Sequence, residues 1–199
     1  MYNFKGFTQK ANTALNLSIT CAQDMGHTYV GTEHILLGLL KENTGVAAVV
    51  LSDCGLDDIT LYNHIADSIG KGAQTVLTAD DFTPRTKRVM QMAVLNSARM
   101  GHNFVGTEHL LVSILSESDS YAVRFLNELN VNISSIVASL KASLNEDNPQ
   151  DSADIGATHQ KDSSKNKGTK TLSQYGVDLT QKAIEGAIDP VIGRDKEIE

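Results

Sequence analysis

The sequence MGHTYVGTEHIL at residues 25–36 returns as MGHNFVGTEHLL at residues 100–111. Nine of the twelve positions are identical at an offset of 75 residues, and the same offset aligns Phe7-Thr8 with Phe82-Thr83. Chance does not give such a match at one constant spacing, and the period is too long for a solenoid repeat. The stretch therefore predicts a duplicated small domain, with repeat one at residues 4–71 and repeat two at residues 79–144.

Each repeat is predicted to contain four helices. Thr8 is a candidate N-cap of the first helix and Gly26 its stop, while Thr83-Pro84 opens the equivalent helix of repeat two. No segment shows sustained alternation of polar and apolar residues, so strands are not expected. We expect an all-α fold of two tandem pseudo-symmetric four-helix repeats. In repeat one the helices are expected at about residues 8–24, from 32 onward, at 46–53 and at 57–70.

Composition limits the class of protein. Apolar residues make up 41% of the 199, aromatic residues only 5%, and Trp is absent, so the core must be aliphatic. A net charge of −7 argues against a general nucleic-acid or anionic-membrane binder. With no run of 18 apolar residues and no apolar leader in MYNFKGFTQK, we expect a cytoplasmic chain. Two cysteines are too few for a disulfide scaffold, and we expect Cys21 and Cys54 to be buried thiols.

The chain divides into three parts. Residues 1–144 carry 13 acids and 10 bases and nearly all large apolar residues. Residues 145–171 are mostly Ser, Asp, Asn, Lys and Gly, which predicts a flexible linker because such a stretch buries too little surface to offset its ordering entropy. Residues 172–199 are partly apolar again, and we expect them to be the start of a truncated module.

The repeated G-T-E-H block has two interpretations. In the structural one, the glycine allows a tight turn, the threonine caps a helix and the glutamate complements the helix dipole. In the functional one, a carboxylate lies close to a helix N-terminus, and if the Thr8 and Glu33 helix starts are neighbours, the pocket suits a zwitterion with guanidinium and phosphate groups. The residues concerned are Gly31, Thr32 and Glu33, and their counterparts Gly106, Thr107 and Glu108.

Catalytic and metal sites are not expected. The candidate ligands His27, Glu33 and His34, with His102 and His109 in repeat two, lack a third strong ligand at helical spacing, so packing and capping roles are favoured. Cys21 falls on an apolar helix face, which argues against a nucleophile. No Gly-rich phosphate loop occurs, since Gly70-Lys71-Gly72 lacks the required spacing, so no cofactor and no nucleotide hydrolysis are expected in this chain.

The duplicated F-T-x(17)-G-H-x-x-V-G-T-E-H-[IL]-L unit resembles the Clp repeat N-terminal domain of ClpC-type Hsp100/Clp AAA+ ATPases over about residues 4–144. Asp178-Leu179-Thr180 and the sequence DPVIGRD at residues 189–195 are similar to the opening of the first AAA+ module in that family. Both parts occur in the family's order across a polar linker. The resemblance implies that ATP and Mg²⁺ belong only to ATPase modules absent from this chain.

The resemblance also implies a role in protein quality control. In the family this domain sits on the ATPase ring, docks adaptor proteins of the MecA or arginine-kinase type, and captures unfolded or arginine-phosphorylated substrates for ClpP. The positions matching the phosphoarginine site are Glu33 and Glu108 for the guanidinium, with Thr8 and Thr83 at the phosphate-facing helix starts. The isolated domain is expected to be a monomer, because the family's hexamer depends on the ATPase modules.

One departure and two alternatives stay open. The sequence SESDSYAVR at residues 116–124 replaces the glycine-containing turn that repeat one keeps at Gly45, so the turn of repeat two is expected to differ. The chain could instead be a structural or adaptor-only docking module without phosphoarginine binding. The other alternative, a metal-dependent enzyme, would have to use the histidines.

Overall fold

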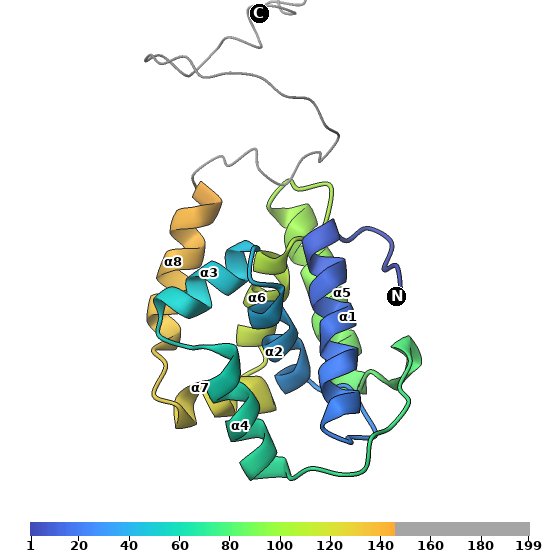
Figure 1. Cartoon of the computed structure of the whole chain (residues 1–199). Coiled ribbons are helices and arrows are strands. Elements are labelled where there is room, and N and C mark those ends of the chain that lie inside the picture. The colour runs from blue at the N-terminus through green and yellow to red at the C-terminus, as the bar shows by residue number, and fades with distance from the viewer. Residues whose placement is uncertain (146–199) are drawn as a thin grey trace, which may run out of the picture. The chain divides into compact units, whose positions relative to one another are not determined.

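The computed structural model describes residues 1–145; the predicted linker beyond residue 145 and the predicted module start at 172–199 lie outside the described residues. The described part is built from α-helices and one short 3-10 helix, η1 (Figure 1). Their bounds are α1 Gln9–Asp24, α2 Thr32–Glu42, α3 Val46–Asp53, α4 Asp58–Ile69, η1 Ala79–Asp81, α5 Pro84–Arg99, α6 Thr107–Leu115, α7 Tyr121–Glu128 and α8 Ile133–Asn145.

This order confirms the all-α fold with four helices per repeat. The predicted cap Thr8 accepts a hydrogen bond from the Ala11 N–H at 3.3 Å, and Thr83 accepts one from the Thr86 N–H at 3.1 Å. Gly26 follows the C-cap of α1 with a φ of 72°, the left-handed conformation that ends a helix at glycine. Local sequence signals therefore set the helix starts and stops.

The two repeats exchange their N-terminal contacts. Phe7 of repeat one forms an isolated parallel bridge with Val105 of repeat two, and Phe82 of repeat two forms the matching bridge with Val30 of repeat one. The residues that lead into α1 therefore lie beside the start of α6, and those that lead into α5 lie beside the start of α2. This exchange decides which residues share a site.

Helices α2 and α6 occupy the centre of the bundle, where they pack on each other and on helices of both repeats (Figure 1). Helix α2 packs most extensively on α1, and Gly38 explains how the two come so close: a Cβ there would lie 2.3 Å from the Ala14 carbonyl oxygen. Repeat two has Ser113 at the equivalent position, whose hydroxyl accepts a hydrogen bond from the Asn96 amide at 3.0 Å. Helices α1 and α2 therefore pack more closely than their counterparts α5 and α6.

The turn before the third helix differs between the repeats, in line with the sequence. After α2, Asn43 takes a φ of 63° and the Glu42 carboxylate accepts the Gly45 N–H at 2.6 Å. In repeat two, Ser120 caps α7 by accepting the Val123 N–H at 3.2 Å. Helices α3 and α7 nevertheless have the same length, eight residues each.

Two expectations about exposure are resolved. Cys21 is buried, and burial raises its pKa to about 11, but Cys54 is only half-buried at the end of α3, so the expectation of two buried thiols was wrong for Cys54.

No single helix in residues 1–145 has the length and apolar character to cross a membrane; only α2 and α3 taken together, with a 94° bend between them, meet those criteria.

Candidate functional site

The most unusual side chains are the two repeated glutamates. Glu33, the second residue of α2, is 1% exposed, and Glu108, the second residue of α6, is 6% exposed. Each keeps one buried carboxylate oxygen, Oε1 of Glu33 and Oε2 of Glu108, without a hydrogen-bond partner in the described part of the chain. A buried carboxylate oxygen without a donor is costly in free energy, so both glutamates are candidates for binding a ligand that supplies a hydrogen-bond donor.

Gly31 and Gly106 create the space for these carboxylates. A Cβ on Gly31 would lie 2.2 Å from Oε1 of Glu33, and one on Gly106 would lie 2.1 Å from Oε1 of Glu108. Both glycines have φ values near −90°, which any residue adopts, so their role is steric. Glycine two residues before the glutamate lets its carboxylate fold back against the helix start.

The threonines of the repeated block do not cap their own helices, which corrects the structural interpretation of the sequence. Gly31 is the N-cap of α2 and Gly106 that of α6. The Thr32 hydroxyl instead accepts the Ala122 N–H at the start of α7, at 3.4 Å, and Thr107 accepts the Ala47 N–H at the start of α3, at 3.3 Å. Each threonine therefore ties its helix to a helix of the other repeat.

Glu33 lies in the wall of a cavity of about 560 Å³ that three helix starts surround. The starts are those of α2, α5 and α7, so the cavity gathers backbone N–H groups and the side chains of Arg85 and Arg124. The Arg85 guanidinium donates to the Asp119 carbonyl oxygen. The lining residues are Tyr29, Gly31, Thr32, Glu33, Thr83, Arg85, Asp119, Ser120, Tyr121 and Arg124.

The first-helix start that meets Glu33 in this cavity is that of Thr83 and not that of Thr8, so the neighbouring Thr8 and Glu33 helix starts that the zwitterion hypothesis required are not found. The Thr83 N–H donates to the Val30 carbonyl at 3.1 Å, close to Glu33 in the chain. The Thr8 N–H donates to the Val105 carbonyl at 3.0 Å, which places Thr8 with Glu108. An offset within one sequence cannot reveal this exchange, because both pairings obey the same 75-residue spacing.

The surroundings of Glu108 repeat this arrangement. The Lys10 ammonium donates to the Thr44 carbonyl at 3.2 Å, as Arg85 donates to Asp119. Lys10 and Thr44 are the counterparts of Arg85 and Asp119 at the 75-residue offset. The starts of α1, α3 and α6 therefore meet at Glu108 as those of α5, α7 and α2 meet at Glu33.

The histidines form short chains of hydrogen bonds beside the glutamates. Because the Gly31 N–H donates to His34 Nδ1 at 2.9 Å, the proton of a neutral His34 is on Nε2, which donates to His27 Nδ1 at 2.7 Å. His27 Nε2 in turn donates to the Gly70 carbonyl at 2.9 Å. Burial, with a smaller contribution from His27, lowers the pKa of His34 to about 3. His34 therefore fixes the start of α2 as a neutral ring.

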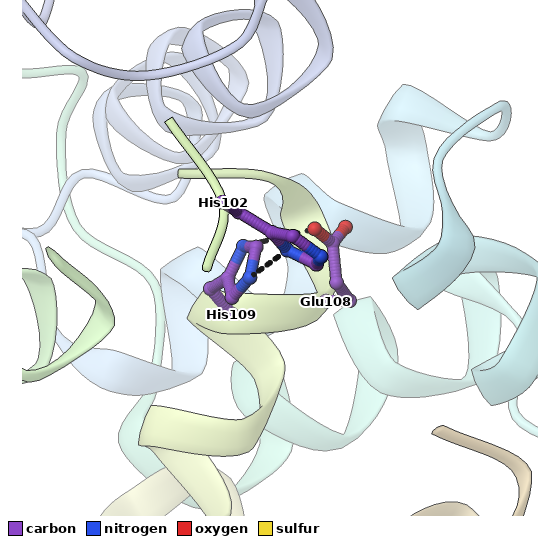
Figure 2. Close-up of side chains that lie close together, drawn as sticks. All are labelled: His102, Glu108 and His109. Carbon is purple, nitrogen blue, oxygen red and sulfur yellow. Dashed lines mark hydrogen bonds and ion pairs between the residues drawn. The ribbon is translucent and has the colours of Figure 1, made fainter. Parts of the chain in front are cut away.

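Repeat two brings His102, Glu108 and His109 together, with potential metal-ligating atoms within 4.8 Å of one another (Figure 2). However, His109 Nδ1 accepts the Gly106 N–H at 2.9 Å, and its Nε2 bonds to His102 Nδ1 at 2.8 Å. A metal ion could bind His109 only by breaking one of these hydrogen bonds. In the described residues, His109 stabilises the start of α6 through these hydrogen bonds, as His34 stabilises the start of α2.

The two carboxyl groups differ in their electrostatic surroundings. Burial raises the pKa of Glu33. Burial acts in the same direction on Glu108, but a hydrogen bond from a protonated His109 and its charge lower the pKa of Glu108 below the usual value. That lowering needs a proton on His109 Nδ1, the atom that accepts the Gly106 N–H. Burial is therefore the influence that the two carboxyl groups share.

Fold and sites together define a duplicated all-helical module with a buried carboxylate at two equivalent helix starts. The chain belongs to the Clp repeat (R) N-terminal domain family, whose sequence model matches residues 6–129. It is 40% identical over 196 residues to an ATP-dependent Clp protease ATP-binding subunit ClpA homolog of Porphyra purpurea. It is 39% identical to the chloroplastic chaperone protein ClpC2 of Arabidopsis thaliana.

The chain spans only part of these relatives: 98% of it aligns, but with 23% of the Porphyra protein and 20% of the Arabidopsis protein. Among solved structures, the N-terminal domain of ClpD from Arabidopsis thaliana covers 71% of this chain and 99% of its own, with a TM-score of 0.61 and 26% identity. The ClpV N-domain, solved in complex with a VipB peptide, covers 68% of this chain and 88% of its own with a TM-score of 0.52; at 21% identity it shares the fold.

Proposed function

We propose that this chain is the substrate- and adaptor-recognition domain of a Clp ATPase that feeds ClpP-type proteolysis, and that it binds phosphorylated arginine at Glu33 and Glu108. The observation that carries the proposal is the Glu33 carboxyl group, which lies in the wall of the cavity and keeps one buried oxygen without a hydrogen-bond donor in the described residues. A guanidinium group supplies a positive charge and several N–H donors in one plane, which is what such a carboxylate lacks.

The same cavity offers partners for a phosphate. The starts of α5 and α7 supply N–H groups and the positive ends of helix dipoles, and Arg85 adds a cation. The Thr83 hydroxyl accepts the Thr86 N–H and shares a hydrogen bond with the Thr86 hydroxyl at 2.8 Å, so it can donate to a phosphate when Thr86 is the donor of that pair. A group with a cationic and an anionic end therefore fits better than a plain arginine or a free phosphate.

Two such sites in one domain favour bivalent capture. A substrate that carries two marks would bind the second site as an intramolecular event, which raises avidity well above the affinity of either site. Lys10 and Thr8 would serve at Glu108 as Arg85 and Thr83 serve at Glu33.

A second candidate function is docking of adaptors without phosphoarginine. It is favoured by the peptide complex of the ClpV N-domain, which has this fold. Adaptors of the MecA or arginine-kinase type, unfolded substrates and the ATPase ring are partners that we propose from family membership. A cytoplasmic location stays a prediction, because relatives of this chain include proteins named as chloroplastic.

Calorimetry with free phosphoarginine tests the proposal. We expect binding to the full chain, with arginine and inorganic phosphate each binding much more weakly. The double variant Glu33→Ala/Glu108→Ala should lose binding and keep its helical circular dichroism, and Asp67→Ala, which removes an exposed acid of α4, should bind as the parent does. Unchanged affinity in the double variant would overturn the site assignment, and adaptor binding with no phosphoarginine binding would favour the docking function.

A further inference from the structure

The two carboxylate pockets share their backbone framework but differ at their rims. We propose that they discriminate between the residues that flank the bound arginine: the Glu108 pocket selects apolar neighbours, and the Glu33 pocket selects polar ones. This inference rests on the proposed function, because it requires both pockets to bind the modified arginine. It extends that function by assigning each pocket its own class of substrate sequence.

The common framework allows each rim residue to be compared with its counterpart. The Ala47 and Ala122 N–H groups make equivalent hydrogen bonds to Thr107 and Thr32. Helix α3 therefore lies at Glu108 as α7 lies at Glu33. By the 75-residue offset from the residues that line the Glu33 cavity, we assign residues of α3 and of the loop before α6 to the surroundings of Glu108, which we call the Glu108 pocket.

The Glu33 rim is polar. Tyr29 and Tyr121 present hydroxyl groups, and Tyr121 is 48% exposed. Arg124 is 64% exposed while its Nε donates to a Glu128 carboxylate oxygen at 2.7 Å, and Asp119 is exposed beside it. An apolar substrate residue at this rim would remove water from these charged and hydroxyl groups without replacing its hydrogen bonds.

The Glu108 rim has exposed apolar side chains beside the polar Lys10 and Thr44. Phe104 takes the place of Tyr29 and is 59% exposed, and Val49 takes the place of Arg124 and is 52% exposed. Val46 takes the place of Tyr121 and is half-buried. Exposed apolar side chains beside a polar site offer apolar surface to a bound peptide. A Leu or Val next to the arginine would bury against these apolar side chains, whereas a polar residue would gain less from them than from the hydroxyl and charged groups of the Glu33 rim.

Single-site chains and paired peptides test the inference. Glu33→Gln leaves only the Glu108 pocket, and Glu108→Gln leaves only the Glu33 pocket. Each full-length variant is titrated with phosphoarginine peptides flanked by Leu and Val or by Ser and Asn. In the Glu33→Gln chain we expect the apolar peptide to bind about fivefold more tightly, as burial of part of an aliphatic side chain predicts. In the Glu108→Gln chain we expect no such preference, or the reverse.

Exchange of one exposed rim residue should transfer the preference. Val49→Arg in the Glu33→Gln chain should abolish the advantage of the apolar peptide, and Arg124→Val in the Glu108→Gln chain should create one. Each exchange also changes the charge beside a carboxylate, so the preference is measured as the ratio of the two peptide affinities within one chain, which a uniform change in phosphoarginine affinity does not alter.

The outcomes separate the two proposals. If neither single-site chain binds free phosphoarginine, the proposed function fails and the rim preference fails with it. If both bind free phosphoarginine but do not distinguish the peptides, or if the exchanges leave the preference unchanged, only the rim preference is overturned. A preference of the same direction and size in both pockets would also overturn it.

Discussion

The Glu33 carboxylate lies so close to Gly31 that a Cβ on the glycine would be 2.2 Å from Oε1. The glycine is extended, with a φ of −93°, so the contact and not the backbone conformation requires it. One missing methyl group two residues away thus allows a buried carboxylate to face a cavity. The same relationship joins Gly106 to Glu108.

Gly31→Ala should therefore weaken ligand binding at Glu33. In a Glu108→Gln chain, where only the Glu33 pocket is left, we expect the displaced carboxylate to reduce phosphoarginine affinity about tenfold or more. The free energy of unfolding should also fall, by about 1–3 kcal/mol, because alanine is a much poorer cap than glycine and its Cβ displaces a buried carboxylate. Calorimetry and urea denaturation measure the two effects, and full affinity in the variant would contradict the steric role of Gly31.

Gly26 and Gly101 offer a matched pair for stability. Both have positive φ, 72° and 78°, so alanine costs each about 1 kcal/mol of backbone strain. A Cβ on Gly26 would also lie 2.3 Å from the Gly72 backbone, whereas Gly101 has open space. We expect Gly26→Ala to lower the free energy of unfolding by about 2 kcal/mol more than Gly101→Ala, as overpacking does. Equal losses in urea denaturation would show that Gly72 does not press on Gly26.

His34 should make stability depend on pH. Its pKa is about 3 in the folded chain and near 6.5 when unfolded, because burial and His27 disfavour its charged form. As pH falls from about 6.5 towards 3, the unfolded chain takes up a proton that the native chain does not. The free energy of unfolding should then fall by about 1.4 kcal/mol per pH unit from this residue.

The control for this prediction is His34→Gln. Glutamine at the third helical position can still accept the Gly31 N–H, as it does in capping boxes, but it does not titrate in this range. Denaturation between about pH 7 and about pH 4 should show a shallower loss of stability in the variant than in the parent. Identical slopes would mean that another group carries the pH dependence.

The two thiols should differ in reactivity. Cys21 is 2% exposed with a pKa raised by burial to about 11, so little thiolate forms and no reagent reaches it. Cys54 is half-buried and should react with a disulfide reagent in the native chain. The single variants Cys21→Ser and Cys54→Ser assign the signals. Rapid native labelling of the Cys54→Ser chain would contradict the burial of Cys21.

Prediction from sequence worked best where a signal is local. The sequence predicts helix starts at or near Thr8, Asp57 and Thr83. The side chain of each accepts a hydrogen bond from a backbone N–H in the first turn of its own helix. Thr32 shows where that reasoning fails. It has the residue type of a cap, yet Gly31 is the cap, because the Thr32 hydroxyl is used by α7, ninety residues away in the chain.

The repeated block shows the same division for the candidate site. The sequence singles out Glu33 and Glu108, because two copies of one motif place an acid at a helix start. It does not reveal that both acids are buried with an unpartnered oxygen, since burial depends on the packing of helices from both repeats. It also leaves open whether Thr8 lies beside Glu33, whereas the structure places Thr83 there.

By itself, the sequence determined the helix starts and the all-α class, because caps and apolar spacing act over a few residues. The constant offset between two segments determined the duplication and singled out the two glutamates. Only the tertiary structure decided that Phe7 pairs with Val105 and Phe82 with Val30, so that each pocket is built from both repeats. The physical reason is that an internal duplication leaves contacts within and between its copies equally consistent with the spacing, and only the packing of the two cores selects between them.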